Sequence, residues 1–144
     1  CDDCQEVCPV NDTHPTSSSV AVRITAPPQN RPVDVIELLE CDDDELMRRH
    51  GHWYIPRRRP EYLRRNALVV LANVVDEPDD RVRAVVSSAL ASESAMVRGH
   101  AVWAGYRLGL SDLVGEAVAR PDFAADDPDG VIAAELDEIG WGAR

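Results

Sequence analysis

The sequence predicts an all-α fold in which short helices pair as antiparallel hairpins. From residue 61 onward, segments rich in helix formers are separated only by short breaks that contain Pro, Gly, Ser or Asp. Connections this short place consecutive helices side by side and antiparallel. In addition, a phrase at Leu63–Leu68 recurs 34 residues later at Val97–Val102. A period of that length is typical of helical-hairpin repeats, in which each pair of helices buries its apolar face against its neighbours.

The chain is expected to comprise three parts. Its 144 residues suffice for one compact domain of ordinary size and a short appendage. Residues 1–11 hold three of the four cysteines and form a separate segment. Residues 12–34 are rich in Pro, Ser, Thr and Asn without a sustained period, which predicts a linker. Residues 35–144 are predicted to form the helical domain.

The helical domain is expected to open with two short helices. Val35–Leu39 is apolar and contains helix formers, and a second helix is expected over Asp42–Met47. The acidic residues at the start of that second segment lie near first-turn amides, where negative charge is favourable. Gly51 should end this helix, and Pro56 and Pro60 should keep the following stretch out of regular helix.

The remaining helices carry the repeated phrase, which reads apolar-Arg-x-x-Ala-apolar. They are expected over Glu61–Val75, Asp80–Ala91, Ala95–Leu108, Asp112–Ala119 and Val131–Ile139. The phrase resembles the second helix of HEAT repeats, so we expect a HEAT-like helical-repeat domain. In such repeats the alanine allows close helix approach and the arginine commonly braces the next unit. Arg64 and Arg98 therefore have a structural interpretation as braces, and the acidic end from Asp126 to Arg144 is expected to be a terminal cap.

The cysteine segment has the spacing of iron–sulfur ligands. Cys1, Cys4 and Cys8 form a C-x2-C-x3-C run that is followed by Pro9. In two-cluster ferredoxins, the cysteine just before proline ligates the neighbouring cluster. We therefore predict that Cys1 and Cys4 bind one 4Fe-4S cluster and Cys8 the other, in the tail end of a ferredoxin-like segment. The other ligands are expected before residue 1, which makes the chain the carboxy-terminal piece of a longer protein.

Two alternatives for the cysteines stay open. Zinc sites also use C-x2-C pairs, although only Cys41 and His14 remain as a fourth ligand here. Disulfides are the second alternative. Reduced thiols in a cluster motif favour a reducing compartment, so a cytoplasmic protein is expected. The sequence contains no long apolar run and no export segment, which predicts no membrane association.

Charge is distributed unevenly along the chain. The net charge is -11, which speaks against non-specific nucleic-acid binding, because such binding depends on cationic side chains. All 15 basic residues are arginine, however, and seven of them lie within residues 48–65, opposed there only by Glu61. These seven are Arg48, Arg49, Arg57, Arg58, Arg59, Arg64 and Arg65. The sequence therefore predicts one local basic patch on an acidic body.

Two phrases together resemble a known family. The first is C-D-D-C-Q-x-V-C-P-x-N at residues 1–11, and the second is R-N-A-L-x-x-L-x-N at residues 65–73. In this order they resemble the carboxy-terminal part of epoxyqueuosine reductases. The resemblance covers nearly the whole chain, with a looser match after Ser111. Val10 stands where the family often has tryptophan, and Ala72 where glycine is common, which indicates a divergent subgroup.

The resemblance implies an oxidoreductase that reduces epoxyqueuosine to queuosine at the tRNA wobble position. Electrons from an external donor would pass through two 4Fe-4S clusters to cobalamin. Cys1, Cys4 and Cys8 carry over as cluster ligands. The cobalamin pocket and the acidic proton donor of the family lie in an amino-terminal domain, so no catalytic residue is expected within this chain, and a monomer is expected.

The arginine-rich stretch is the predicted contact with the tRNA anticodon stem-loop. The predicted RNA-binding residues are Arg57, Arg58, Arg59, Arg64, Arg65 and Asn66. Arginines of this kind grip phosphates, and the adjacent Trp53 and Tyr54 offer rings on which bases can stack. The alternative is a solvated turn whose arginines pair with the acidic run from Asp42 to Glu45.

Other chemically interesting residues have simpler interpretations. His50 and His52 are two positions apart, do not share a helix face, and are expected at the surface. Cys41 is expected to be a small buried residue, and Trp103 and Tyr106 are expected to pack in the core. The sequence contains no Ser/His/Asp grouping, glycine-rich phosphate loop or H-E-x-x-H motif.

Two rival functions remain beside the reductase. The first is a HEAT-type interaction scaffold whose iron–sulfur loop is structural or vestigial. The second is a related corrinoid and iron–sulfur reductase that acts on another substrate. For that second case the arginine patch should be dispensable for activity.

Overall fold

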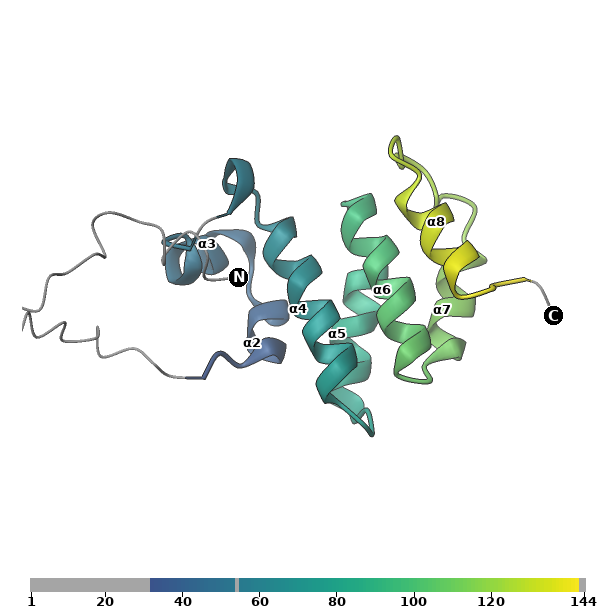
Figure 1. Ribbon diagram of the computed structural model, residues 1–144, viewed down its shortest axis with the longest axis horizontal. Helices are drawn as coiled ribbons and strands as arrows, with labels where there is room; N and C mark the ends of the chain where they lie inside the picture. The colour runs from purple at the N-terminus through teal and green to yellow at the C-terminus, as the bar shows by residue number, and fades with distance from the viewer. Residues whose placement is uncertain (1–31, 54, 143–144) are drawn as a thin grey trace, which may run out of the picture. The chain divides into compact units, whose positions relative to one another are not determined.

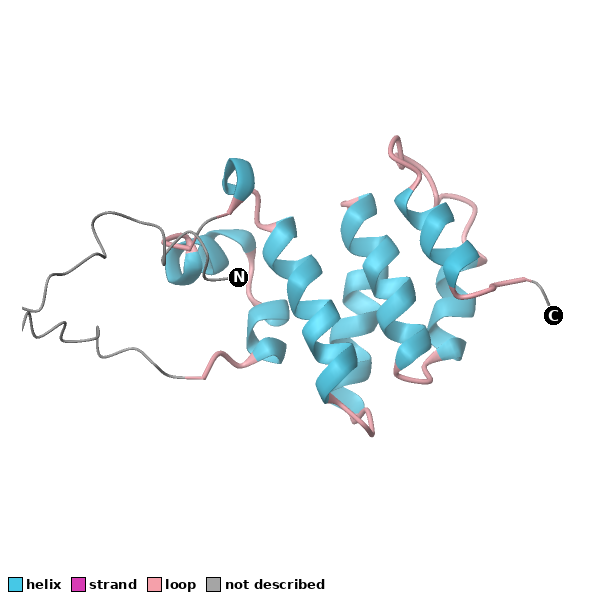
Figure 2. Ribbon diagram, in the orientation of Figure 1, coloured by secondary structure: helices cyan, strands magenta, loops and turns pink. Residues whose placement is uncertain are grey.

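The computed structural model describes residues 32–53 and 55–142 of the chain, and the regular secondary structure of these residues is helical. Val33–Arg144 forms one compact unit. Within the described residues there are seven α-helices, one 3-10 turn and no strand (Figure 2). The all-α prediction is thereby confirmed. Cys1, Cys4 and Cys8, and the predicted linker up to Arg31, lie outside the described residues.

The helices follow the order expected from the sequence. Their bounds are α2 Val35–Glu40, α3 Asp43–His50, the 3-10 turn η1 Pro56–Arg58, α4 Glu61–Val74, α5 Asp80–Leu90, α6 Ala95–Arg107, α7 Ser111–Val118 and α8 Val131–Glu138. Each predicted helix is present, and the ends differ from the expected ones by a few residues at most. Gly51 does end α3, and Pro56 begins η1 instead of a regular helix.

Aspartates begin three of the helices. The carboxylate of Asp34 accepts hydrogen bonds from the amides of Ile36 (2.9 Å) and Glu37 (3.0 Å) at the start of α2. Asp42 and Asp79 cap α3 and α5 in the same way, each at 2.8 Å. Such caps satisfy amides that lack a partner within the helix, and each contributes about 1 kcal/mol. The sequence therefore sets the helix starts locally.

The helices are arranged in two layers within this unit. α6 packs against both α4 and α8, and these three lie side by side in one layer (Figure 1). α2, α5 and α7 form the second layer, in which α5 contacts both of the others. Contacts between α2 and α4, between α5 and α6, and between α6 and α7 join the layers. Of the consecutive helices, α5 packs against α6 and α6 against α7, whereas α4 and α8 make most of their contacts with α6.

Apolar side chains from every α-helix fill the space between the layers. The largest fully buried ones are Leu46, Leu68, Leu71, Leu90, Ile132, Val86, Val97, Val102 and Val114. Two glycines let α6 approach its neighbours closely. A Cβ at Gly99 would lie 2.8 Å from Val131 of α8, and one at Gly105 would lie 2.7 Å from Val114 of α7. Larger residues at these two positions would push the helices apart.

A buried arginine joins two connections of the fold. Arg98 on α6 is only 7% exposed, and its guanidinium donates to four backbone oxygens. Ser92 and Glu93 supply two of these oxygens before α6, and Phe123 and Ala125 supply the others between α7 and α8. The interpretation of Arg98 as a brace is confirmed.

Among the described helices, none combines the length and the apolar character that crossing a bilayer would require.

Candidate nucleic-acid interface

The arginine-rich stretch runs from the end of α3 through η1 into the start of α4. Four of its seven arginines have carboxylate partners. Arg48 contacts Glu45 at 2.6 Å, and Arg49 contacts Glu37 at 2.6 Å and also Glu45. The hydrogen bonds from Arg48 and Arg49 hold the pKa of Glu45 below its usual value. The basic patch is therefore smaller than the sequence count predicted.

Arg59 and Arg64 are the other two paired arginines. Arg59 pairs with Glu61, and the Arg64 guanidinium donates to Asp43 at 2.7 Å. The alternative that the arginines pair with the acidic run is thus confirmed for contacts to Asp43 and Glu45. The sequence did not predict the pairing of Arg49 with Glu37, because Glu37 lies in a different helix from the acidic run.

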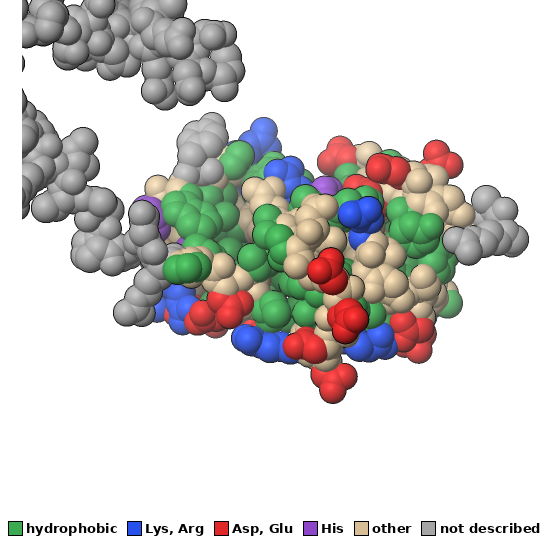
Figure 3. Space-filling model, turned by 60° about the horizontal axis from the view of Figure 1, so that its bottom comes forward, with side chains coloured by type: hydrophobic (Ala, Val, Ile, Leu, Met, Phe, Trp, Pro, Cys, Tyr) green, Lys and Arg blue, Asp and Glu red, His purple; other side chains and the backbone are tan. Residues whose placement is uncertain are grey.

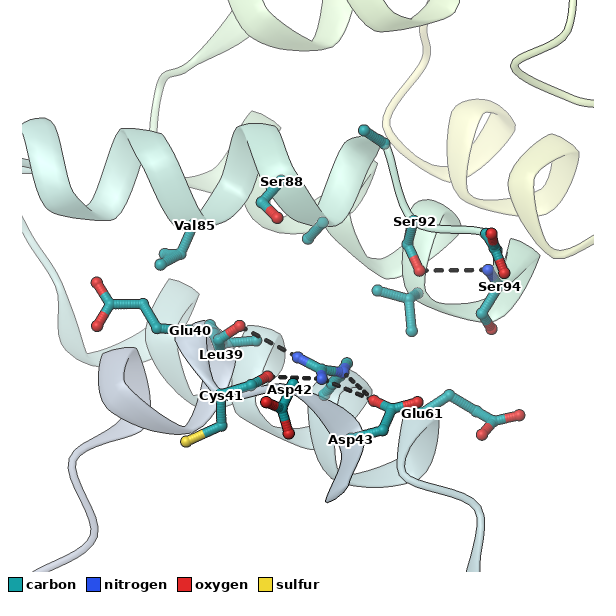
Figure 4. Close-up of a pocket in the computed structure, with 15 residues that line it drawn as sticks. Leu39, Glu40, Cys41, Asp42, Asp43, Glu61, Val85, Ser88, Ser92 and Ser94 are labelled. Carbon is teal, nitrogen blue, oxygen red and sulfur yellow. Dashed lines mark hydrogen bonds and ion pairs between the residues drawn. The ribbon is translucent and has the colours of Figure 1, made fainter. Parts of the chain in front are cut away.

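Arg64 lies in a groove and is bound to its wall. Its Nη1 donates to the Leu39 carbonyl at 3.1 Å, and its Nη2 donates to the Cys41 carbonyl at 2.7 Å (Figure 4). The side chain is 19% exposed. The groove runs between the α2–α3 connection, α4, α5 and the start of α6, and acidic groups such as Glu40 line it. This geometry favours the bracing role for Arg64, which corresponds to that of Arg98.

The three remaining arginines have no carboxylate partner among the described residues. They are Arg57, Arg58 and Arg65, and we call them the arginine corner. Arg57 and Arg58 are exposed, and both have a φ of 53°. Left-handed backbone at residues other than glycine costs energy and is frequent at functional sites. The turn therefore holds two adjacent arginines outward in an uncommon conformation.

Tyr62 and Asn66 surround the third member of the corner. Arg65 donates to the Asn66 side-chain oxygen from Nε (3.1 Å) and Nη2 (2.8 Å). Its guanidinium carbon lies 5.4 Å from the centre of the Tyr62 ring, and that of Arg59 lies 5.9 Å away. Cation–π contacts of this kind hold an arginine in place without neutralising it. Asn66, predicted to bind RNA, here orients Arg65.

A cluster of three rings precedes the arginine corner in the loop after α3. We call His50, His52 and Trp53 the His–Trp–His cluster. The Trp53 ring centre lies 4.6 Å from that of His50 and 5.9 Å from that of His52. Trp53 is 40% exposed and His52 is exposed, whereas His50 is half-buried. Burial, followed by the charges of His52 and Arg49, lowers the pKa of His50. Tyr54 lies outside the described residues.

The rest of the described surface is mixed in charge. Figure 3 shows arginines and acidic side chains alternating along one edge, with apolar side chains across the middle of that face. Two ion pairs join helices of the layer formed by α2, α5 and α7: Arg81 with Glu40 at 2.6 Å, and Arg83 with Asp112 at 2.5 Å. Arg98, Arg107 and Arg120 likewise have no carboxylate partner among the described residues, but Arg57, Arg58 and Arg65 are the three that lie within one short stretch of the chain.

The described residues supply no metal centre. Among them, no group of three or more His, Cys, Asp or Glu side chains is placed to hold a metal ion. Cys41 is a free, half-buried thiol, which is more exposed than expected. Trp103 and Tyr106 are likewise half-buried, with Trp103 packed against the core. The predicted ligands Cys1, Cys4 and Cys8 lie outside the described residues.

Sequence reasoning missed two features of this site. The first is the pairing of Arg49 with Glu37, for which the sequence carries no signal, because it depends on how α2 and α3 pack. The second is the His–Trp–His cluster, which places two histidines against one indole although they do not share a helix face. The H-x-H-W spacing at a helix end could have indicated the second feature.

Comparison with protein-family models, with curated proteins and with solved structures gave no match for this chain.

Proposed function

We propose that this chain is the carboxy-terminal part of an epoxyqueuosine reductase, with a HEAT-like helical domain that holds tRNA at the arginine corner. The observation that carries the proposal is the phrase C-D-D-C-Q-x-V-C-P-x-N at residues 1–11, which contains three cysteines and is followed by the second family phrase at residues 65–73. The arrangement of the described helices in two layers, with Arg64 and Arg98 bound to backbone carbonyls, supports the HEAT-like part.

The chemistry of the cysteine set fits an iron–sulfur cluster. Cys1, Cys4 and Cys8 offer thiolates, and thiolates at these spacings are the ligands that 4Fe-4S clusters take. Two such clusters would supply electrons to cobalamin in the parent protein. Within this chain, the cysteines would hold the clusters and the helical domain would position the RNA. The described residues are assigned no part in proton transfer.

The arginine corner supports the RNA part of the proposal through charge. Phosphates are positioned by cationic side chains that are free to contact them, and Arg57, Arg58 and Arg65 meet that condition among the described residues. The net charge of -11 repels RNA from the rest of the chain. A small positive corner on an acidic body therefore favours one docking position over non-specific binding.

The proposal is tested by turnover of the full-length protein. Purified without oxygen and given cobalamin and a reductant, it should convert epoxyqueuosine in tRNA to queuosine. Cys4→Ser should abolish conversion and leave tRNA binding unchanged, because it removes a cluster ligand outside the RNA contact. Cys41→Ser is the matched control and should retain activity, since Cys41 belongs to no cluster motif. Equal activity of the Cys4→Ser protein would contradict the proposal.

One observation favours the scaffold as a second candidate. Val69, Val70 and Val74 of α4 are 36%, 44% and 66% exposed. Apolar side chains gathered on one exposed helix face are typical of protein-binding surfaces. A full-length protein that binds no iron, yet depends on these valines for association with another protein, would support the scaffold. A protein that reduces another substrate independently of the arginine corner would support the related corrinoid reductase.

A further inference from the structure

Trp53 is an exposed aromatic residue beside free positive charge. Its side chain is 40% exposed, although tryptophan usually buries most of its large apolar surface. Trp53 is not part of the hydrophobic core of the described residues, so packing does not explain its position. An exposed indole in a loop that also holds arginines without carboxylate partners has the composition of sites that bind single-stranded nucleic acid, where rings stack on bases and cations contact phosphates.

The indole is held in place by its neighbours. The His50 ring lies against it at 4.6 Å between centres with a tilt of 40°, and the His52 ring meets it edge-on at 5.9 Å and 67°. The Trp53 amide also donates to the His50 carbonyl at 2.9 Å, which closes the turn after α3. Two residues later, Ile55 is buried and anchors the loop to the core. A ring fixed in this way loses little entropy when a ligand binds.

The arginine corner is tied to the same loop. Arg58 Nη1 donates to the Gly51 carbonyl at 3.2 Å, so its guanidinium lies against the loop that carries Trp53. One hydrogen bond leaves the other guanidinium N–H groups free to donate. Arg57, next to it in left-handed backbone, is exposed. A ring for a base and donors for its phosphates therefore belong to one short segment.

We propose that Trp53 is the stacking platform for one unpaired nucleobase, whose flanking phosphates bind the arginine corner. This inference rests on the proposed RNA contact and adds the residue that would bind the base: Trp53, held between its two histidine neighbours, as the platform for one loop nucleotide. Bases within a duplex already stack on each other and present no free face to a side chain. The His–Trp–His cluster thus selects loop nucleotides, while the arginines alone would accept any phosphate backbone.

The test is a double-mutant cycle between Trp53 and the RNA loop in the full-length protein. The probes are an RNA hairpin with an unpaired loop, the same hairpin with abasic loop positions, and a blunt duplex. Trp53→Ala should weaken binding of the intact hairpin about tenfold or more and leave the abasic hairpin and the duplex unchanged, because stacking on an aromatic ring contributes about 1–3 kcal/mol per base. Trp53→Phe should retain most of the affinity.

Trp103→Phe is the matched control, because Trp103 is a half-buried tryptophan on α6, a helix that holds none of the arginines of the arginine corner. It should bind all three probes like the unaltered protein. Equal loss on intact and abasic hairpins in Trp53→Ala, or no loss on either, would overturn the stacking inference and leave the RNA contact standing. An unaltered protein that binds none of the probes would overturn the RNA contact itself.

Discussion

At the scale of single residues, the role of each arginine depends on what its guanidinium contacts. Arg98 and Arg64 occupy equivalent positions 34 residues apart, and both donate to backbone carbonyls. The sequence predicted this bracing, because the repeated phrase places both arginines at one position of a helical hairpin. It could not predict that Arg49 pairs with Glu37, since that contact depends on the packing of α2 and α3. Hence the sequence count of free positive charge was too high.

Arg98→Met should destabilise the helical domain strongly. The substitution keeps much of the side-chain volume and removes the donor for four carbonyl oxygens. A buried acceptor without a donor costs about 1–3 kcal/mol when water cannot reach it. Three of the four hydrogen bonds are only partly buried, so water can replace them in part and a total loss of about 3 kcal/mol is expected. Urea unfolding followed by circular dichroism measures it. Arg107→Met, at an exposed site over the Trp103 ring, should cost less than about 1 kcal/mol.

His50 should make stability fall as the pH drops below the ordinary histidine pKa of 6.5. Its pKa is lowered from 6.5, first by burial and then by positive neighbours, so the folded protein binds its proton less readily than the unfolded chain. Its contribution is therefore fully present above the unfolded pKa and is lost as pH falls. Unfolding free energies measured across this range should decline with acidification. His50→Gln should flatten this decline, and an unchanged slope would contradict the assignment.

At the scale of helices, the sequence predicted the elements well and their mutual placement less well. The helix starts could be predicted at Asp34, Asp42 and Asp79, because each carboxylate accepts a hydrogen bond from an amide only two or three residues ahead. Short connections predicted antiparallel neighbours. The grouping of α4, α6 and α8 in one layer depends instead on contacts between distant residues. The left-handed backbone of Arg57 and Arg58 was also missed, because arginine carries no local preference for it.

Because α6 packs closely on α8, a methyl group added at Gly99 should lower the stability of the fold, whereas one added at Gly115 should not. Gly99→Ala should destabilise the fold by about 1–3 kcal/mol, since the new Cβ would lie 2.8 Å from Val131. Gly115→Ala on α7 is the matched control, because its Cβ would meet Trp141 at an ordinary 3.7 Å. Alanine favours helix over glycine, so this control should be neutral or stabilising by up to about 1 kcal/mol. Thermal unfolding of both variants compares them, and equal shifts would contradict the packing argument.

At the scale of the whole molecule, the separation of charge determines how RNA would bind. The chain is acidic, and the arginine corner comprises only three arginines, so few phosphates should be contacted at once. Each contacted phosphate releases bound counterions and steepens the salt dependence of affinity. The affinity for RNA is therefore expected to depend only weakly on salt concentration, and replacing arginines of the arginine corner is expected to change that dependence measurably.

Arg57→Asn with Arg58→Asn should weaken binding of the tRNA anticodon stem-loop and make its salt dependence shallower. The logarithmic slope should fall by about 1.5, the effect of two lost phosphate contacts, while asparagine tolerates the left-handed backbone. Binding titrations at several salt concentrations measure the slope. Arg48→Gln with Arg107→Gln changes the net charge equally and should leave the slope nearly unchanged. Equal effects of the two pairs would show that the corner makes no direct contact.

The most direct test of the proposed reductase is the iron and sulfide content of the full-length protein, purified without oxygen and examined by electron paramagnetic resonance after reduction. About eight iron atoms per chain, with the signal of reduced 4Fe-4S clusters, are expected from two clusters. Replacing Cys4 or Cys8 should each disturb a different cluster. Little iron, or zinc in its place, would contradict the electron relay and leave the helical scaffold as the better account.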